Sequence, residues 1–460
     1  MVQIATIYSN KIDDRFEARY YINFAKINRV FINFDNITIS EIADLKGGYT
    51  PNYKYFKEEP ESSEIYRKYF PFIKSSNVKR GVLDINNLSF IDRYAHERLL
   101  KKSIIQGGDL LIAMTGTVGA VTLVPQTIFQ ANISQNVVRI RIADKWRNKI
   151  PEEYLVVLLN SKFGQIQIQG LLTSTNQKYL NQIAIGKIKI PILKNHENII
   201  NIYRKAYKME IDSLLKIEQA KKLFEEEINI NHKEINEDKV YSVNSADLTD
   251  IFTPKFYYPK YLNTLKALKK KFKTIKLGEI ADIKRGDEVG SENYRKYIDR
   301  KDSDIPFIRT SDLVNYEIDN YPDYYIDEEI YNELKQDLKA GDIIYTKDGK
   351  IGLSAILTAE DKCILASGLA RIRIKKELDP YYVFLVLSTN IGYYQAMQRV
   401  VIAATLPHLQ QERLGEIEIP IINEQTQSKI SQLVAEAFKL KAEKKKLFRE
   451  ALTKVEELLK

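Results

Sequence analysis

The sequence predicts an α+β protein built from two similar strand-rich domains, each followed by a long helix. The first observation is an internal repeat. Gly108–Gly119 (GDLLIAMTGTVG) and Gly341–Gly352 (GDIIYTKDGKIG) have equal length and share Gly and Asp at matching places. The second is that further short matches follow the same order at nearly the same offset. The third is that a long stretch without Gly or Pro, with apolar residues at helical spacing, ends each copy.

The further matches extend the repeat over most of the 460 residues, at offsets of 229 to 238. They are Arg19–Tyr21 with Phe256–Tyr258, Glu41–Asp44 with Glu279–Asp282, Pro71–Ile73 with Pro306–Ile308, Arg139–Ile142 with Arg371–Ile374, and Lys187–Ile192 with Glu416–Ile421. One such match is weak, but an ordered series indicates a tandem duplication. We therefore expect two copies of one unit, related by a pseudo-two-fold axis.

Within each unit the residue pattern predicts strands first and helices later. Asp109–Met114 and Val137–Ile142 are short apolar or alternating runs, which predict strands. A helix is expected to start at Pro151 and at Pro380, because proline suits the first helical position. The alternating segments that end at Pro191 and Pro420 predict a strand that closes each domain.

The two stretches that follow predict long helices with a narrow apolar seam. The expected seam residues are Ile200, Tyr203, Tyr207, Ile211, Leu214, Ile217, Phe224 and Ile228 in the first helix, and Ile430, Leu433, Ala437, Leu440, Leu447, Ala451 and Leu458 in the second, where Lys444 interrupts the pattern. A seam of this kind packs against another helix, so we expect an intramolecular coiled coil. The alternative is that each helix lies on its own domain. The polar segment Asn231–Asn244 is expected to be a linker.

Composition excludes several classes of protein. No run of 18 apolar residues is present, and the first residues lack an apolar signal segment. Cys363 is the only cysteine and the four histidines are scattered, so neither a disulfide scaffold nor a zinc site is expected, and a cytoplasmic location fits. The formal net charge of +9 favours a polyanionic partner such as nucleic acid, although compositional drift gives the same excess.

Motifs for catalysis are missing. Neither a P-loop nor a dinucleotide-binding glycine motif occurs. Asp379–Tyr382 (DPYY) resembles an amino-methyltransferase motif but lacks its second proline, and it begins a helix. Pro322-Asp323 with Glu333–Lys335 imitates a nuclease pattern, but the first copy has no counterpart. We expect no catalytic residues and no metal site in this chain.

Three pairs of loop segments are candidates for contact with DNA. The first pair is the glycine loops, with Thr115 and Thr117 in one copy and Lys347, Asp348 and Lys350 in the other. Glycine allows positive φ and close backbone approach to a ligand, whereas the alternative is a plain tight hairpin. The glycines are kept and the polar residues change, as expected of two readers with different specificities.

The other candidates follow two further segments of the repeat. The second set is Lys74, Ser75, Ser76 and Asn77 against Arg309, Thr310 and Ser311, directly after the Pro-Phe-Ile strands. Arg and Lys pair with guanine and Asn with adenine, while the alternative is a solvated loop that caps a helix. The third set is Ser174, Asn176 and Lys178 against His408.

With these motifs in hand, the chain resembles the specificity subunits of type I restriction–modification systems. The resemblance rests on the paired glycine loops, the Arg-Ile-Arg-Ile strands, and the Ile-Pro-Ile segment that leads into Asn423–Gln425 and a long helix. Lys194–Glu197 departs from the family pattern at the matching place. The resemblance implies target recognition domains at 1–194 and 236–422, separated by antiparallel spacer helices at 195–235 and 423–460.

The resemblance also implies the function: non-catalytic, sequence-specific DNA binding, with each domain reading half of a bipartite target. Two methyltransferase subunits would dock on the helices, and restriction subunits would add translocation and cleavage. S-adenosylmethionine, ATP and Mg would sit on those partners, with no cofactor in this chain. One alternative is a stand-alone DNA methyltransferase or nuclease with unrecognised catalytic residues, which would bind S-adenosylmethionine by itself. Another is a coiled-coil scaffold that does not touch nucleic acid.

Overall fold

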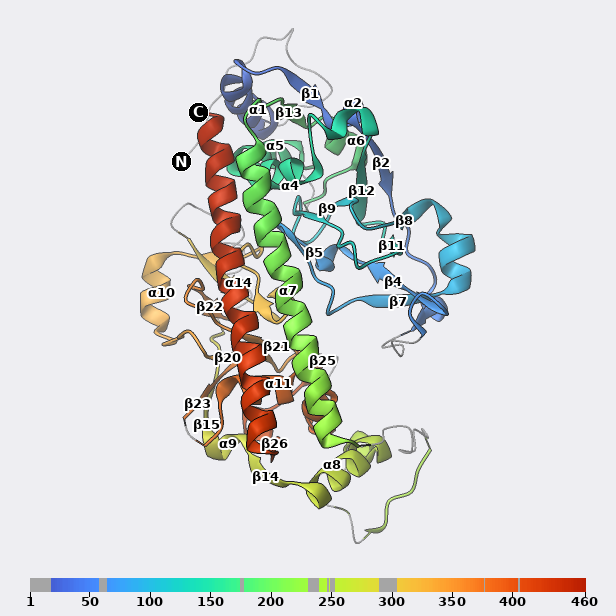
Figure 1. Ribbon diagram of the computed structural model, residues 1–460, viewed down its shortest axis with the longest axis vertical. Coiled ribbons are helices and arrows are strands. Elements are labelled where there is room, and N and C mark those ends of the chain that lie inside the picture. The colour runs from blue at the N-terminus through green and yellow to red at the C-terminus, as the bar shows by residue number, and fades with distance from the viewer. Residues whose placement is uncertain are drawn as a thin grey trace. The chain divides into compact units, whose positions relative to one another are not determined.

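The computed structural model divides into two compact units (Figure 1). It describes residues 18–57, 64–173, 178–230, 240–245, 248, 253–288, 304–375, 377–403 and 406–460. Unit 1 contains 1–207 and 445–460, and unit 2 contains 208–444. Both boundaries fall inside the long helices α7 (Glu197–Ile228) and α14 (Glu424–Leu458). No described helix is long and apolar enough to cross a membrane.

The main sheet is four-stranded and antiparallel in each unit, with the same strand order. In unit 1 the order is β10 (Val121–Leu123), β9 (Leu110–Ala113), β12 (Val137–Ile142) and β2 (Ala43–Gly47). In unit 2 it is β21 (Ser354–Ile356), β20 (Ile343–Thr346), β23 (Leu369–Ile374) and β15 (Ala281–Arg285). The duplication seen in the sequence is therefore a duplication of topology, and the predicted α+β class is confirmed.

The smaller sheets repeat in the same way. Their shared core is one antiparallel and one parallel pairing: β7 (Ser89–Asp92), β4 (Tyr69–Ile73) and β11 (Ala131–Ile133) in unit 1, and β19 (Tyr325–Ile326), β16 (Ile305–Ile308) and β22 (Ile364–Leu365) in unit 2. Unit 1 extends its sheet with β3 (Phe56–Lys57) and β8 (Ile104–Ile105). In each unit the second set of candidate residues directly follows a strand of the smaller sheet, β4 in unit 1 and β16 in unit 2.

Paired short strands complete each unit. The hairpins are β5 (Val78–Lys79) with β6 (Val82–Leu83), and β17 (Leu313–Val314) with β18 (Glu317–Ile318). The closing strands are β13 (Lys189–Pro191), paired with β1 (Asn36–Thr38), and β26 (Glu418–Ile421), paired with β14 (Lys273–Lys276). The predicted closing strands are present, and the second runs one residue past Pro420.

Of the shorter helices beside the sheets, the two with predicted starts, α4 (Glu152–Asn160) and α11 (Pro380–Leu387), begin at or next to the expected residue. Further helices are α1 (Ala18–Phe31) and α5 (Lys162–Leu171) in unit 1, and α8 (Pro259–Lys271) and α12 (Asn390–Gln398) in unit 2. Pro380 occupies the first helical position as predicted, whereas Pro151 is the capping residue just before α4. The apolar run of α4 is buried, and the phenol of Tyr154 donates to the Pro191 carbonyl over 2.7 Å.

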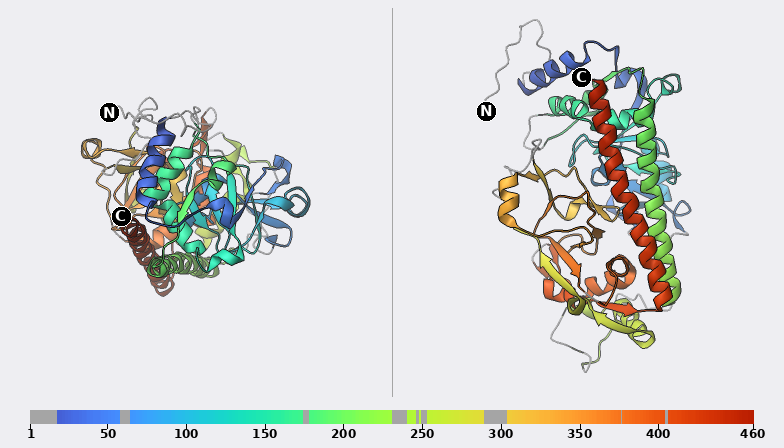
Figure 2. Two further views of the ribbon diagram at one scale, coloured as in Figure 1. Left: turned by 90° about the horizontal axis from the view of Figure 1, so that it is seen from above. Right: turned by 60° about the vertical axis from the view of Figure 1, so that its left-hand side comes forward.

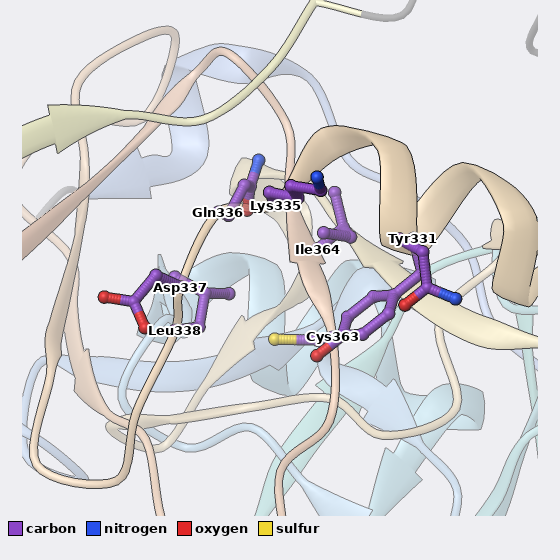
Figure 3. Close-up of a pocket in the computed structure, with 8 residues that line it drawn as sticks. Tyr331, Lys335, Gln336, Asp337, Leu338, Cys363 and Ile364 are labelled. Carbon is purple, nitrogen blue, oxygen red and sulfur yellow. The ribbon is translucent and has the colours of Figure 1, made fainter.

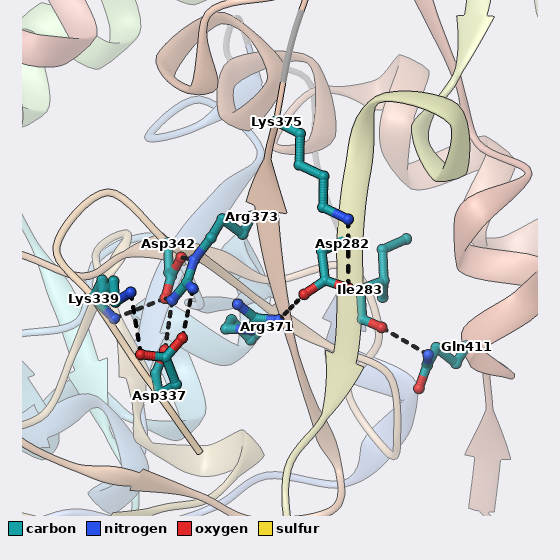
Figure 4. Close-up of polar contacts among 9 residues, drawn as sticks. All are labelled: Asp282, Ile283, Asp337, Lys339, Asp342, Arg371, Arg373, Lys375 and Gln411. Atoms are coloured by element: carbon teal, nitrogen blue, oxygen red, sulfur yellow. Dashed lines mark hydrogen bonds and ion pairs between the residues drawn. The ribbon is translucent and has the colours of Figure 1, made fainter. Parts of the chain in front are cut away.

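Ion pairs on the main sheets explain the repeated Arg-Ile-Arg-Ile sequence. Arg371 pairs with Asp282, and Arg373 pairs with Asp342 over 2.7 Å (Figure 4). Arg139 with Asp44, and Arg141 with Asp109 over 2.6 Å, form the same two pairs in unit 1. The hydrogen bond to Asp342 raises the pKa of Arg373 above its ordinary value. Each of these arginines is therefore held by a carboxylate of its own unit.

The two long helices pack side by side and antiparallel (Figures 1 and 2). In unit 2 the order of their contacts runs in opposite directions along the chain: Glu227 with Thr426 over 3.0 Å, Lys216 with Glu436 over 2.5 Å, and Glu210 with Lys441 over 3.4 Å. In unit 1 the ring of Phe448 lies 6.1 Å from the ring of Tyr203. The expected pairing of the helices is confirmed. The predicted linker at 231–244 lies largely outside the described residues.

The predicted seam of α14 is wrong by one residue at several places. The structure buries Val434, Lys441, Phe448 and Leu459 rather than Leu433, Leu440, Leu447 and Leu458, and the last of these is 42% exposed. On α7 it buries Ala206 and Glu210, whereas Tyr207 and Ile211 are half-buried. The reason is that each helix runs through both units and also packs on their cores, so the buried face is wider than a coiled-coil seam and is turned relative to it.

A charged cluster is buried where α7 and α14 meet the hairpin β17–β18 of unit 2. Lys444 Nζ lies 2.9 Å from a carboxylate oxygen of Glu210 and also pairs with Glu317. The Asn315 amide donates to Glu210 over 2.9 Å. Burial by itself would raise the pKa of Glu210, but the ammonium groups of Lys441 and Lys444 lower it below its ordinary value. Lys444, which interrupts the apolar pattern of the sequence, is therefore a buried and paired charge.

Candidate nucleic-acid interface

In unit 1 the described parts of the three candidate segments come together. The loop that begins at Lys74 follows β4, and the glycine turn joins β9 to β10. The hydroxyl of Thr115 lies 3.4 Å from that of Ser75, which links these two segments. Two residues past Lys178, the described end of the third segment, Leu180 N–H donates to the Met114 carbonyl over 3.1 Å. Segments that are far apart in the sequence thus form one surface.

Unit 2 brings its corresponding segments together in the same manner. Leu409 N–H donates to the Lys347 carbonyl over 2.8 Å, and Gly349 N–H donates to the Pro407 carbonyl over 3.0 Å. Thr310 and Asp348 flank Gly368: a Cβ added there would lie 3.0 Å from the Thr310 methyl group and 3.5 Å from Asp348 Cβ. The same three parts of the repeat therefore meet in both units.

The glycine turns have the positive φ that the sequence suggested. Gly116 and Gly349 have φ of +71° and +67°, and Gly119 and Gly352 have +80° and +98°. A Cβ on Gly119 would lie 2.5 Å from Ile168, and one on Gly352 would lie 2.8 Å from the Tyr393 ring. The turns join neighbouring antiparallel strands, β9 to β10 and β20 to β21, and they also hold polar side chains beside the other candidate loops.

Asn77 is built into the protein rather than presented to a ligand. Its side chain is 2% exposed, accepts from Lys74 N–H over 2.9 Å, and donates to the carbonyls of Asp84 and Asn87. Asp312 takes the same place in unit 2, where it accepts from Arg309 N–H over 2.9 Å. Since the Asn77 amide is committed to shaping its own loop, we leave this residue out of the contact surface.

Arg309 is held by its own unit more than the sequence suggested. Its guanidinium lies 4.0 Å from the centre of the Tyr324 ring and 3.5 Å from Asp323. A second carboxylate, from Asp312, lies 3.6 Å away. The Asp323 of the nuclease-like pattern thus partners Arg309. For Arg309 to grip a guanine, it would have to exchange these contacts for new ones.

The remaining candidates differ in exposure. Lys74, Ser76, Ser311 and Lys350 are exposed, while Ser75, Thr115, Lys178, Thr310, Asp348 and His408 are partly exposed. Thr117 and Lys347 are buried, and the Lys347 ammonium lies 3.1 Å from the Asp348 carboxylate. Ser174 and Asn176 lie outside the described residues.

Tyr179 is a residue of this surface that the sequence comparison missed. It precedes Leu180 just as His408 precedes Leu409, and these two leucines make the equivalent main-chain bonds. Position 179 is therefore the partner of 408. The offset of 229 residues, which already relates Lys187 to Glu416, would have identified it.

A separate cavity of about 290 Å³ lies beside α10 (Glu328–Leu334) in unit 2 (Figure 3). Tyr331, Lys335 and Cys363 contribute to its wall. None of the candidate residues lines it, so it is distinct from the loop surface. Among the residues that the structure describes, no group of three or more His, Cys, Asp or Glu is placed to hold a metal ion.

The family model for the type I restriction modification DNA specificity domain matches the chain twice, over residues 32–220 and 269–447. The chain therefore belongs to this family, and it is a DNA-sequence specificity component rather than a catalytic one. The two matches coincide with the two copies of the repeated unit. No curated protein matches the sequence.

Solved structures of such subunits are similar to the chain at low sequence identity. The S subunit of a type I restriction-modification system from M. genitalium is 18% identical, with a TM-score of 0.34 over 93% of this chain and 95% of that one. The HsdS subunit from Thermoanaerobacter tengcongensis is 14% identical, with a TM-score of 0.28 over 93% and 96%. A structure described in work on complex assembly and conformational transition of the type I R-M system is 16% identical, with a TM-score of 0.31 over 93% and 97%.

Proposed function

We propose that the chain binds duplex DNA at a bipartite, asymmetric target, and that each unit reads one half of it through its loop surface. The observation that supports this best is the convergence of the same three segments in both units, on one backbone frame with different polar side chains. A shared frame with altered side chains is what two readers of different sequences need, because base edges are distinguished by their donors and acceptors.

Within this surface we assign different tasks to different residues. Lys74 and Lys350 are exposed cations at the edges of their loops, and they are suited to phosphate contacts that position the protein. Thr115, Asp348 and His408 are partly exposed and are held by hydrogen bonds, so they are suited to base edges. Arg309 keeps a place among the candidates, since its guanidinium remains partly exposed beside Tyr324.

Partner subunits complete the proposal. Two methyltransferase subunits are proposed to dock on α7 and α14, and restriction subunits would join them. S-adenosylmethionine, ATP and Mg are proposed to sit on those partners and not on this chain. The support is membership of a family defined by type I restriction modification, together with a similar structure whose description concerns assembly of such a complex.

Exchange of one unit tests the division of the target. Replacing 256–422 with the corresponding segment of a related chain is expected to change one half of the selected DNA sequence and leave the other half unaltered. Selection from a random duplex library, followed by sequencing, measures both halves at once. The proposal that each unit reads its own half-site is wrong if the exchange alters both halves, or if the parent chain selects no sequence.

Salt dependence tests the phosphate contacts. Lys350→Ala is expected to weaken binding to all sequences alike and to reduce the slope of log K against log salt by about one, because one fewer counterion is released. Lys74→Ala should do the same in unit 1. The matched control is Lys439→Ala, an exposed residue of α14, which should leave the slope unchanged. A change in base preference without a change in slope would instead make these lysines base readers.

A further inference from the structure

Two positions in each unit are placed opposite each other by an equivalent main-chain hydrogen bond. Leu180 N–H bonds to the Met114 carbonyl in unit 1, and Leu409 N–H bonds to the Lys347 carbonyl in unit 2. Thr115 follows Met114 and Asp348 follows Lys347 on the glycine turns. Tyr179 and His408 come just before the two leucines on the third segment. In unit 2 the structure pairs position 348 with 408 as an antiparallel bridge, and the equivalent main-chain bond in unit 1 makes 115 and 179 the corresponding positions.

In unit 2 these side chains are in direct contact. His408 Nδ1 bonds to one carboxylate oxygen of Asp348, and the other oxygen lies 3.1 Å from Lys347 Nζ. The side chains of His408 and Asp348 are 41% and 33% exposed. Because a carboxylate only accepts, His408 carries its proton on Nδ1, and Nε2 is the ring nitrogen left for a ligand.

In unit 1 the same positions carry hydroxyl groups. Thr115 and Tyr179 are both partly exposed, and Thr115 donates to Ser75. A hydroxyl both donates and accepts, so it suits either kind of base edge. The backbone arrangement is the same in both units. Unit 1 presents hydroxyl groups, which both donate and accept hydrogen bonds, whereas unit 2 presents an imidazole.

We propose that these two pairs, Thr115 with Tyr179 and Asp348 with His408, determine which base each unit selects at one position of its half-site. This inference rests on the proposed DNA-reading function. A protonated His408 donates from Nε2, which suits the N7 and O6 acceptors of guanine. A neutral His408 accepts at Nε2, which suits the amino groups of adenine or cytosine. Asp348 is a positioning residue, since it holds the imidazole in one tautomer.

Among the described residues, charged groups near this pair come from the same turn and from neighbouring segments, where Glu288 accepts from Ser367, the residue before Gly368. Lys347 and Asp348 come from the turn between β20 and β21, and Lys350 lies farther along the same turn. Arg309, next to Thr310, is directed toward Asp312 and Asp323. Imidazole groups as a class change charge between about pH 5 and pH 8, so this is the range in which base selection by unit 2 is compared.

The experiment is selection from a random duplex library with the full chain at about pH 6 and about pH 8. We expect one position of one half-site to shift toward guanine at the lower pH by about tenfold, with the other half-site unchanged. His408→Gln should abolish the shift, while its melting temperature stays that of the parent chain. The pH comparison on the parent chain needs no variant and so does not depend on any variant folding.

Exchanging the pairs gives the matched control. Asp348→Thr with His408→Tyr should remove the pH-dependent position, and Thr115→Asp with Tyr179→His should create one in the other half-site. If the parent chain selects a bipartite sequence that is identical at both pH values, and the exchanged chains select that same sequence, the pair assignment is wrong while the proposed function stands. If the parent chain selects no sequence, the proposed function itself is contradicted.

Discussion

Replacing Lys444 with methionine is expected to destabilise unit 2 by about 3–5 kcal/mol, because the change leaves buried carboxylates short of a cation. In the folded protein the ammonium groups of Lys441 and Lys444 balance the carboxylates of Glu210 and Glu317. Without the Lys444 ammonium group, Lys441 alone balances the carboxylates of Glu210 and Glu317. Denaturant unfolding of the full chain, followed by a probe in unit 2, measures the loss.

Two variants control this prediction. Lys439→Met removes an exposed cation from the same helix and should change stability by less than about 0.5 kcal/mol. Lys444→Met combined with Glu317→Gln restores the charge balance and should recover much of the lost stability. If the double variant is no more stable than Lys444→Met, the loss comes from packing and not from unpaired charge.

The same cluster should make unit 2 sensitive to acid. The pKa of Glu210 is lowered in the folded state, so its contribution to stability is present above the unfolded pKa of about 4.3 and is lost as pH falls toward the folded value. The pKa of Lys444 is raised: burial acts against this, but the carboxylates of Glu210 and Glu317 outweigh it. Its contribution is therefore present at neutral pH and is lost only at strongly alkaline pH.

Phe448→Ala is expected to cost about 3–5 kcal/mol in unit 1, the usual penalty for truncating a buried phenylalanine. The ring packs against Gly81, where a Cβ would lie 2.6 Å from Phe448 Cζ, and near the ring of Tyr203. The phenol of Tyr203 in turn lies 3.4 Å from the Gly81 carbonyl. Thermal melting of the full chain, with a probe in unit 1, measures the effect.

Leu447→Ala is the matched control, because the heptad pattern placed Leu447 in the seam and the structure leaves it half-buried. Its truncation should cost about 1 kcal/mol or less. Equal losses for the two variants would mean that the helices pair through the face that the heptad pattern defines.

Features that occur in both copies of the repeat could be predicted from the sequence. Features that depend on the packing of one copy could not. The strand predicted at Val137–Ile142 is present with those bounds as β12, and the glycine turns have the predicted positive φ. Both features are local or are seen twice in the chain. The predicted seam of α14 lies one residue away from the buried face, because the helix also packs on the cores of both units and those contacts follow no heptad pattern. Leu447 and Phe448 are both apolar, so the sequence does not show which of the two is buried.

At the candidate surface, the sequence also does not show which side chains are already bonded to partners within the protein. Asn77 and Arg309 have the residue types that bases prefer, yet one is buried in its own loop and the other is held by Asp323 and Tyr324. Those partners lie 7 to 15 residues away, so spacing does not show them. Tyr179 was missed for a different reason: an offset of 230 residues matched His408 with Lys178, whereas the offset of 229 that relates Lys187 to Glu416 matches it with Tyr179.

The buried cluster of unit 2 also fixes how α7 and α14 are aligned along their length. Sliding one helix by a single turn, about 5.4 Å, would move Lys444 away from Glu210 and Glu317 and leave charges buried without partners. Apolar contacts such as those of Ile217 or Val434 would tolerate such a slip far better, since one aliphatic side chain can replace another. The charges that weaken the apolar pattern in the sequence thus define a single register for the helix pair.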